Sequence, residues 1–383
     1  MIPRPEFVRQ IEQSFRVHPA TALLGPRQCG KTTLARMIAS QESSAFFDLE
    51  NPVDVRRLSA PMQALKDLSG LVVIDEVQRK PELFELLRFL IDRPERDARF
   101  LLLESASPHL MKGVSESLAG RIGFVDLTGF QLREIDENQR DRLWARGGFP
   151  RSYLADTDAD SAQWREDFIR TFLERDIPQL GINIAPETLR RFWTMTAHFH
   201  GQVWNAAEFA RSLGSAENTA RRYLDILSGA YMVRVLPPWH ENLKKRQVKA
   251  PKIYIRDSGV CHSLLQLPSL VDVQSHPKLG ASWEGFALEH VIQVYNTRDA
   301  YFWATHSGAE LDLVIFERGK RYGFELKYAD APGKTRSMNI AVQDLGLAHL
   351  WVVYPGHDAY PLDQKISVLP IESVTALPAQ ANP

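Results

Sequence analysis

A short run near the N-terminus has the residue types and the spacing of a phosphate-binding loop. The run follows the apolar segment 22–24 and consists of Gly25, Pro26, Arg27, Gln28, Cys29, Gly30, Lys31, Thr32 and Thr33. A glycine-bounded turn between a strand and a helix gathers backbone N–H groups around a polyphosphate. In this pattern the lysine reaches the β and γ phosphates and the first threonine ligates Mg²⁺. The run therefore predicts a site for ATP and Mg²⁺.

Two adjacent carboxylates further along the chain complete a site of this kind. Asp75 and Glu76 follow the run 71–74, whose four apolar residues have the composition of a buried parallel strand. At the carboxyl end of that strand, Asp75 would hold Mg²⁺ through water and Glu76 would polarise the attacking water. The alternative is that the pair only caps a following helix. Together with Lys31, the pair predicts hydrolysis of ATP to ADP and phosphate.

A second set of charged residues lies near the C-terminus. Glu284 shares one stripe of a predicted helix with apolar residues, and a carboxylate on such a face needs a metal or a cation. In the predicted strand 309–315, alternation puts Leu311 and Leu313 on the face opposite Asp312. We therefore expect Asp312 to face away from the apolar side of its strand.

A hairpin through a turn at 318–320 would bring Asp312, Glu325 and Lys327 to one place that faces Glu284. This is the arrangement of a PD-(D/E)xK nuclease-like core. In such a site Asp312 and Glu325 hold Mg²⁺, Lys327 activates the attacking water, and Glu284 completes the cation site. The alternatives are ordinary alternation of charge on solvated strands, or a relic that binds DNA or has only a structural role.

The elements that must position the first site alternate in type. Strand-like segments at 46–49, 71–74, 99–103 and 122–127 are separated by predicted helices at 53–68 and 81–91. Such alternation is typical of an α/β domain with a doubly wound parallel sheet.

Two arginines are candidates for an arginine finger. Arg121 follows a glycine break at the end of a helix, where its guanidinium could reach the γ-phosphate held by a neighbouring copy. Arg175 is the second candidate. For each, the alternative is an ion pair with a nearby carboxylate. A finger acting in trans requires an oligomer.

The middle of the chain changes character. A helix over 164–180 is expected to form a lid, and helices over 186–199, 205–214 and 215–227 precede a strand at 231–236. Two short helices joined at a glycine and followed by a strand indicate a winged helix-turn-helix.

Such a module would present the start of its second helix to DNA. The DNA-facing residues would then be Asn218, Thr219 and Arg222, while the cluster Lys244, Lys245 and Arg246 would contact phosphates without reading bases. Two alternatives stand beside this interpretation. Winged helices also serve as protein docking units, and the basic cluster could be a solvated loop.

Composition sets outer limits on these interpretations. The chain has 383 residues, a formal net charge of −1 and two cysteines. The near-neutral charge excludes a globally basic nucleic-acid coat, so any DNA contact must be local. Two cysteines, one inside the phosphate loop, favour a reducing cytoplasm. We find neither a signal peptide nor an apolar run long enough to span a membrane.

Several motifs together resemble one known family. They are GPRQCGKTT at 25–33, VVIDEVQ at 72–78, SESLAGR at 115–121, GGFP at 147–150, ERDI at 174–177 and PKIYIRDSG at 251–259. These segments look like those of AAA-type ATPases that carry a C-terminal DUF4143 region. The resemblance implies an ASCE-type P-loop ATPase joined to a DNA-associated, restriction-endonuclease-like domain.

One departure from that family concerns the segment 103–105. The family usually has a Thr-Gly-Ser type run where this chain has Leu103, Glu104 and Ser105. A carboxylate next to phosphates and acidic residues is repelled unless a cation compensates for it. Either Glu104 points away from the site or hydrolysis is weakened. Ser105 or Ser107 could then take the role of the small polar residue that senses the γ-phosphate.

The predicted organisation is a P-loop ATPase domain, a helical lid, a winged helix, a restriction-endonuclease-like α/β domain and a disordered tail. The corresponding ranges are 1–145, 146–185, 186–245, 246–375 and 376–383. We expect a ring-like homo-oligomer, a hexamer, that hydrolyses ATP while it binds or processes DNA, including branched DNA. The alternatives are an ATP-dependent switch that docks a protein partner in a defence or toxin-antitoxin setting, and an ATP-licensed, Mg²⁺-dependent nuclease.

Overall fold

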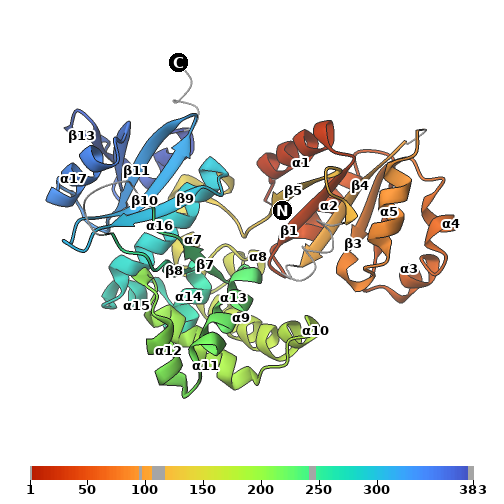
Figure 1. The fold of residues 1–383 in the computed structure, drawn as a ribbon, viewed down its shortest axis with the longest axis horizontal. Coiled ribbons are helices and arrows are strands. Elements are labelled where there is room, and N and C mark those ends of the chain that lie inside the picture. Colours follow the sequence, from red (N-terminus) through yellow and green to blue (C-terminus); the bar gives the residue numbers. More distant parts are fainter. Residues whose placement is uncertain (1, 95–96, 106–116, 241–246, 378–383) are drawn as a thin grey trace. The chain divides into compact units, whose positions relative to one another are not determined.

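The computed structural model describes residues 2–94, 97–105, 117–240 and 247–377 (Figure 1). The chain forms two compact units. Unit 1 comprises residues 1–129 with 229–231, and unit 2 comprises residues 130–228 with 232–383. The boundary expected at 145 therefore lies at 129, and the segments predicted as lid, winged helix and C-terminal domain belong to one compact body. Among the described residues, no helix is both long and apolar enough to cross a membrane.

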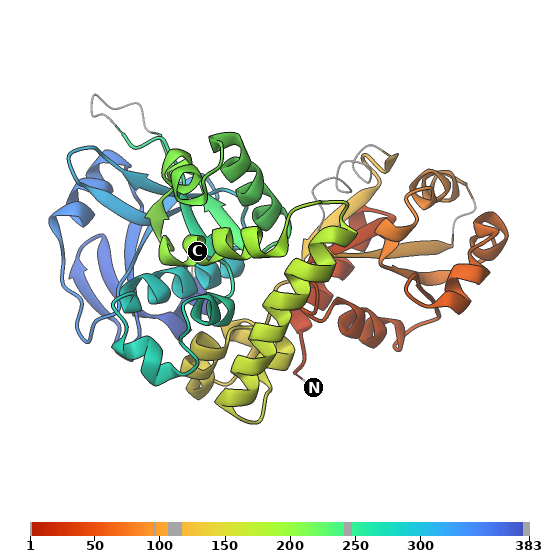
Figure 2. The ribbon, with the colours of Figure 1, turned by 90° about the horizontal axis from the view of Figure 1, so that it is seen from below.

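Unit 1 contains a five-stranded, fully parallel sheet in the order β2-β3-β4-β1-β5, with helices on both sides (Figure 2). Its strands are β1 (Ala20–Gly25), β2 (Ser44–Asp48), β3 (Gly70–Asp75), β4 (Ala98–Ser105) and β5 (Ile122–Asp126). The predicted parallel α/β sheet is confirmed. Because β4 lies between β1 and β3, the end of β4 comes between the phosphate loop and the Asp75–Glu76 pair.

The helices of unit 1 are α1 (Pro5–Val17), α2 (Lys31–Ala39), α3 (Pro52–Arg57), α4 (Pro61–Leu65) and α5 (Leu83–Ile91), with a 3-10 turn η1 (Val77–Arg79). The single helix predicted over 53–68 is wrong. Pro61 breaks it, because proline lacks the N–H that a helix interior needs and pushes the preceding residue out of helical geometry. Pro61 instead begins α4.

The sheet of unit 1 is buried on both faces, which explains its continuous apolar strands. All six residues of β1 are buried. On one face, residues such as Ala22, Ile74 and Leu102 form a cluster with Leu83 and Leu87 of α5. This burial fixes the strand ends that carry the phosphate loop and the carboxylates.

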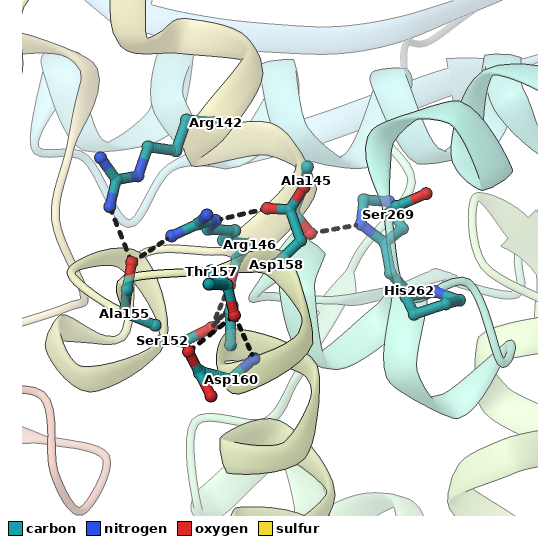
Figure 3. A network of polar contacts seen from close by, with 12 residues as sticks. Arg142, Ala145, Arg146, Ser152, Ala155, Thr157, Asp158, Asp160, His262 and Ser269 are labelled. Atoms are coloured by element: carbon teal, nitrogen blue, oxygen red, sulfur yellow. Dashed lines mark hydrogen bonds and ion pairs between the residues drawn. The ribbon is translucent and has the colours of Figure 1, made fainter.

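Unit 2 begins with a helical segment. Its elements are η2 (Leu132–Glu134), η3 (Glu137–Gln139), α7 (Arg140–Arg146), α8 (Pro150–Tyr153), α9 (Asp158–Thr171), the π-helical turn η4 (Phe172–Asp176) and α10 (Ile177–Gln179). The helix predicted over 164–180 is thus the second half of a longer run. At the end of α7, Arg146 donates hydrogen bonds to Asp158 Oδ1 at 2.7 Å and to the carbonyl of Ala155 at 2.5 Å (Figure 3).

The motif Gly147-Gly148 is a packed junction inside unit 2. Gly147 has φ +76°, and a Cβ there would lie 2.1 Å from Asp257 Oδ1. The backbone N–H of Gly148 donates to Asp257 Oδ2 at 2.8 Å. Two motifs far apart in sequence therefore contact each other, and only glycine fits at position 147.

The next elements follow the predicted series of helices and strands. They are α11 (Pro186–His198), β6 (Gln202–Val203), α12 (Ala206–Leu213), α13 (Glu217–Gly229), β7 (Val233–Leu236) and β8 (Lys252–Ile255). The Asn205 side chain caps α12, which ends at Gly214 with φ +65°, as the sequence predicts.

Strand β8 lies between β6 and β7 in a three-stranded sheet. The predicted boundary at 245 is therefore too early, because β8 belongs to the same sheet as the preceding module. Further contacts join this module to the C-terminal part. Arg234 of β7 donates to Glu289 Oε2 at 2.9 Å, and Arg256 binds the same carboxylate at 3.3 Å.

The C-terminal part contains a six-stranded mixed sheet in the order β13-β14-β12-β11-β10-β9. Its elements are α14 (Ser258–Leu264), α15 (Leu270–Ser275), α16 (Leu279–Tyr295), β9 (Ala300–Ala304), β10 (Glu310–Glu317), β11 (Lys320–Leu326), α17 (Arg336–Asp344), β12 (His349–Tyr354), β13 (Tyr360–Asp363), β14 (Ile366–Pro370) and the 3-10 helix η5 (Ile371–Ala376). The predicted hairpin between β10 and β11 is confirmed.

Two details of this part differ from the prediction. The pairing of β10 with β9 shifts register between Leu311 and Val314, so Leu311 and Val314 pack into the same core cluster and strict alternation fails. The first two residues of the tail predicted from residue 376 are ordered, since Ala376 ends η5 and Leu377 is buried. Residues 378–383 lie outside the described residues.

Candidate functional site

The phosphate loop joins β1 to α2 with the geometry that its glycines demand. Gly30 precedes α2 with φ +101°, a conformation that favours glycine. At Gly25 a Cβ would lie 2.1 Å from the carbonyl oxygen of Leu127, so only glycine permits this close approach of β1 to the residue after β5. Cys29 is buried and its Sγ lies 3.6 Å from the same carbonyl, so this thiol packs inside the loop.

Lys31 and Thr32 begin α2 beside the loop. The buried Lys31 ammonium donates hydrogen bonds to the carbonyls of Gly25 at 3.0 Å and Pro26 at 2.9 Å. Thr32 Oγ1 donates to Asp75 Oδ2 at 2.7 Å, which joins the first turn of α2 to the end of β3. Burial raises the pKa of Asp75, while its hydrogen bond with Thr32 opposes this shift.

Glu76 follows Asp75 in a backbone conformation that is uncommon for a residue with a side chain. Its φ is +54°, and its side chain accepts a hydrogen bond from Gln78 Nε2. Residues held in sparsely populated backbone regions cluster at functional sites. Helix capping alone, the alternative for Asp75 and Glu76, does not account for these contacts. The Asp75 carboxylate binds Thr32 as well as the N–H of Glu76.

These residues fit Mg²⁺–ATP. The loop offers backbone N–H groups at a helix N-terminus, a lysine and, through the Thr32–Asp75 pair, the hydroxyl and carboxylate oxygens that Mg²⁺ prefers. Thr33 is exposed on the same first turn of α2, and Gln28 adopts φ +64° within the loop. Arg27 lies in the same loop and is half-buried.

Glu104, at the end of β4, is almost completely buried, with 1% of its surface exposed, and the charges of Glu76 and Lys31 act on it. Burial, and next the charge of Glu76, raise the pKa of Glu104 to about 7, against the opposing effect of Lys31. Its Oε1 has no hydrogen-bond partner in the part of the chain that the structure describes. The effect of the Glu76 and Lys31 charges favours a position of the Glu104 carboxyl close to the phosphate site over one that points away from it. Ser107 lies outside the described residues.

Sequence analysis did not identify Arg4, which supports the loop from the N-terminal side. Its buried guanidinium donates to the carbonyls of Cys29 at 3.2 Å, Thr128 at 3.0 Å and Gly129 at 2.9 Å. An arginine before a predicted helix has no pattern that points to such a role. It holds the phosphate loop to the segment after β5.

The two arginine-finger candidates lie on the surface of their units. Arg121 binds Asp92 at the end of α5 with two hydrogen bonds, at 2.6 and 2.8 Å, which was the alternative that we considered for it. These bonds raise the pKa of Arg121 further. Arg175 is exposed on η4, and its neighbour Glu174 binds Arg170.

Unit 2 brings the second set of charged residues together. Lys327 Nζ lies 2.7 Å from Glu325 Oε1, and the backbone N–H of Leu326 donates to Asp312 Oδ2 at 2.9 Å. Asp312 and Glu325 are each about 4% exposed, and Glu325 Oε2 has no hydrogen-bond partner among the described residues. Burial, and next the charge of Asp312, raise the pKa of Glu325.

Glu284 is also in this cluster, but its contacts differ from those we predicted. Its Oε1 accepts a hydrogen bond from Tyr254 at 2.6 Å and lies 3.4 Å from Lys252 Nζ. The same Lys252 ammonium lies 3.6 Å from Asp312 Oδ1. Burial and the charge of Asp312 raise the pKa of Glu284, against the effect of Lys252.

The structure does not gather Asp312, Glu325 and Glu284 into the three-carboxylate cation site that we predicted. In the described ranges, no three His, Cys, Asp or Glu side chains surround a point that a metal ion could occupy. Lys252 accounts for this, because it binds the Glu284 and Asp312 oxygens that would otherwise share the metal. Asp312 and the unpartnered Glu325 Oε2 still provide oxygen ligands, so Mg²⁺ would be held by these two residues.

The predicted DNA-facing residues lie at the start of α13. Asn218 and Arg222 are exposed and Thr219 is half-buried. Arg221 on the same helix pairs with Glu217 at 3.7 Å, whereas no hydrogen bond or ion pair joins Arg222 to another described residue. The predicted phosphate contacts Lys244, Lys245 and Arg246 lie outside the described residues.

Comparison with known proteins agrees with this architecture. Residues 17–136 match an AAA domain, residues 137–270 match DUF8612, a domain of unknown function, and residues 279–374 match DUF4143, also a domain of unknown function. The second of these matches spans the helical segment and the three-stranded sheet together. That agrees with a single body in this part of the chain.

Relatives extend over nearly the whole sequence. The chain is 49% identical over 374 residues to the uncharacterized proteins Mb2031c of Mycobacterium bovis and Rv2008c of Mycobacterium tuberculosis, which covers 98% of this chain and 85% of each relative. Among solved structures, the Walker-type ATPase PABY2304 of Pyrococcus abyssi has a TM-score of 0.51 and 17% identity, over 69% of this chain and 96% of its own. This likeness shows a shared fold. With the phosphate loop, the Thr32–Asp75 pair and the sheet order, these matches show that the chain belongs to the AAA-type P-loop ATPases with a C-terminal DUF4143 region, the family that includes the two mycobacterial proteins.

Proposed function

We propose that this protein hydrolyses ATP in unit 1 and binds duplex DNA through the module α11–β8 of unit 2, with nucleotide state controlling DNA affinity. The observation that carries the proposal is the hydrogen bond from Thr32 to Asp75, which joins the phosphate loop to the second half of an ATP site. Bound Mg²⁺ would offset phosphate charge as the γ-phosphoryl group is transferred. We place this activity in the cytoplasm.

The residues of unit 1 supply the remaining chemistry. Lys31 exchanges its loop carbonyl partners for the β and γ phosphate oxygens, and Glu76 accepts a proton from the attacking water. The N–H groups of the loop and of the first turn of α2 donate to the phosphates. The burial of Asp75 and Lys31 keeps bulk water away from these contacts.

We assign Arg121 as an arginine finger that acts on a neighbouring copy, in a ring-like homo-oligomer that we take to be a hexamer. Its partner Asp92 offers a discriminating test, because Arg121→Ala and Asp92→Ala break the same ion pair. Arg121→Ala is expected to lower ATP turnover by about 10³-fold or more, whereas Asp92→Ala retains it. Steady-state phosphate release measures both variants.

Complementation tests the action in trans. Mixing Arg121→Ala with Lys31→Ala subunits pairs an intact finger with an intact phosphate loop, so the mixture is expected to regain activity that each variant lacks. A mixture that stays inactive, together with equal losses in Arg121→Ala and Asp92→Ala, would show that Arg121 has only a structural role.

DNA binding is supported by the order of elements and by the exposed face of α13. Helix α11, strand β6, helices α12 and α13 and strands β7 and β8 occur in the order of a winged helix, with β8 between its partners. Arg222 and Asn218 project from the helix that such modules present to DNA. The near-neutral net charge means that any such contact is local.

Arg222→Ala is expected to weaken binding to a fluorescein-labelled duplex by about tenfold and to reduce the salt dependence by roughly one phosphate contact. Fluorescence anisotropy over a range of salt concentrations measures both quantities. The matched control is Arg170→Ala on α9, since Arg170 is exposed and paired with Glu174. If the two variants bind equally, or if the parent protein does not bind DNA, the assignment of α13 is wrong.

A second function, Mg²⁺-dependent DNA cleavage, is favoured by one observation. Asp312, Glu325 and Lys327 lie together on the β10–β11 hairpin, and the Lys327 side chain is 41% exposed. Lys327 would hold a proton of the attacking water or contact the phosphodiester. Nicked products in the same DNA samples would report this activity. The alternative of a switch that docks a protein partner has no comparable observation in its favour.

A further inference from the structure

The ammonium group of Lys252 lies among the carboxylates of the C-terminal cluster, although its strand belongs to a different sheet. Lys252 begins β8 of the three-stranded sheet and is 6% exposed. Its Nζ lies 3.4 Å from Glu284 Oε1 and 3.6 Å from Asp312 Oδ1. Tyr254, two residues further along β8, donates its hydroxyl to the same Glu284 oxygen at 2.6 Å. Side chains two residues apart share one face of a strand, so β8 presents both groups to the cluster.

Exposure separates the roles of the two lysines in this cluster. The Lys327 side chain is 41% exposed, whereas that of Lys252 is 8% exposed. A phosphodiester that arrives from solvent can therefore touch Lys327, but Lys252 lies behind the carboxylates. The partners of Lys252 are the carboxylates themselves.

Both oxygen atoms of Asp312 and one oxygen atom of Glu284 have protein partners. Asp312 Oδ2 accepts from the N–H of Leu326, Asp312 Oδ1 faces Lys252, and Glu284 Oε1 is shared by Lys252 and Tyr254. A divalent ion placed between Glu284 and Asp312 would meet the ammonium at close range, and like charges repel strongly in a buried site. Glu325 Oε2 is a buried acceptor of the cluster that has no hydrogen-bond partner among the described residues.

We propose that Lys252 is a built-in cation that takes the place of a metal ion between Glu284 and Asp312. The cluster then accepts a single divalent ion, held by Asp312 and Glu325, and Glu284 does not ligate it. Lys252 is thus a positioning residue that holds two carboxylates and connects the three-stranded sheet to the C-terminal sheet. This inference goes beyond the proposed function and does not depend on ATP turnover or DNA binding.

The test counts Mn²⁺ ions bound to the full chain without nucleotide, by electron paramagnetic resonance. Asp75→Asn is present throughout, so that the ATP site does not contribute. The Lys252-containing protein is expected to bind one Mn²⁺, which Asp312→Asn abolishes and Glu284→Gln leaves unchanged. Lys252→Met is expected to create a second Mn²⁺ site between Glu284 and Asp312. Its affinity for Mn²⁺ should be at least about tenfold higher than that of the same position in the parent. Adding Glu284→Gln to Lys252→Met is expected to remove this second site.

Thermal unfolding gives an independent readout. Lys252→Met is expected to lower the melting temperature, because it leaves two buried carboxylates without their cation, and Mn²⁺ is expected to restore much of the loss. Lys252→Arg keeps the charge and is expected to show no such Mn²⁺ effect. If Lys252→Met fails to fold, Glu284→Gln in the parent remains decisive. Weaker Mn²⁺ binding in that variant, or two or no Mn²⁺ ions in the parent, overturns the proposal.

Discussion

Replacing Lys31 with alanine is expected to lower kcat for ATP hydrolysis by about 10²–10³-fold, the loss typical when one charge-stabilising donor is removed from an active site. The ammonium is buried and hydrogen-bonded to two loop carbonyls, so it is positioned where the β and γ phosphates enter the loop. Release of inorganic phosphate under saturating ATP measures the loss.

Two further variants make this result specific. Arg36→Ala changes an exposed cation on the same helix and is expected to keep its turnover. Glu76→Gln is expected to retain nucleotide while it loses hydrolysis, because it removes the group that accepts the proton. Turnover in Lys31→Ala equal to that of the parent would contradict the assignment of this loop as the catalytic phosphate site.

Replacing Glu104 with glutamine is expected to stabilise the nucleotide-free protein at pH 8 by about 3 kcal/mol, because the folded state raises the pKa of this carboxyl from 4.5 to about 7. The sign follows from proton binding. Between these two pKa values the folded state binds the proton and the unfolded state releases it, so stability falls as pH rises towards 7. Glutamine carries no charge at any pH and avoids this loss.

Differential scanning calorimetry at pH 5 and pH 8 measures the difference. At pH 5 the gain should shrink to below about 1 kcal/mol, since Glu104 is then largely protonated in the folded protein. Glu85→Gln on the exposed side of α5 is the matched control. An equal effect of Glu104→Gln at both pH values would show that the buried carboxyl carries no ionisation cost.

The sequence predicted the parts of the fold that rest on short-range patterns. The phosphate loop, the apolar strand before Asp75 and the hairpin between β10 and β11 each depend on spacing within a few residues, and all three are present. The single helix over 53–68 failed because the apolar period continued across Pro61, whose effect on the backbone outweighs periodicity. The predicted alternation of buried and exposed residues in β10 failed at a register shift, which cannot be predicted from a single sequence.

The candidate sites contain residues that only tertiary structure could reveal. Lys252 lies in the family motif at 251–259, and its sequence context does not reveal that its ammonium is buried against Glu284 and Asp312. Arg4 binds carbonyls more than a hundred residues away in sequence, at Thr128 and Gly129. The burial of Glu104 also depends on β4 lying between β1 and β3, an order that the pattern of strands does not fix.

Strand β8 restricts how this protein can be divided by recombination. A breakpoint after Ile255 would separate Glu284 and Asp312 from Lys252 and Tyr254, and it would also separate Glu289 from Arg234. The C-terminal fragment would then keep these buried carboxylates without the cations that β7 and β8 supply. Exchange of the C-terminal domain between homologous genes should therefore succeed only when β7 and β8 travel with it.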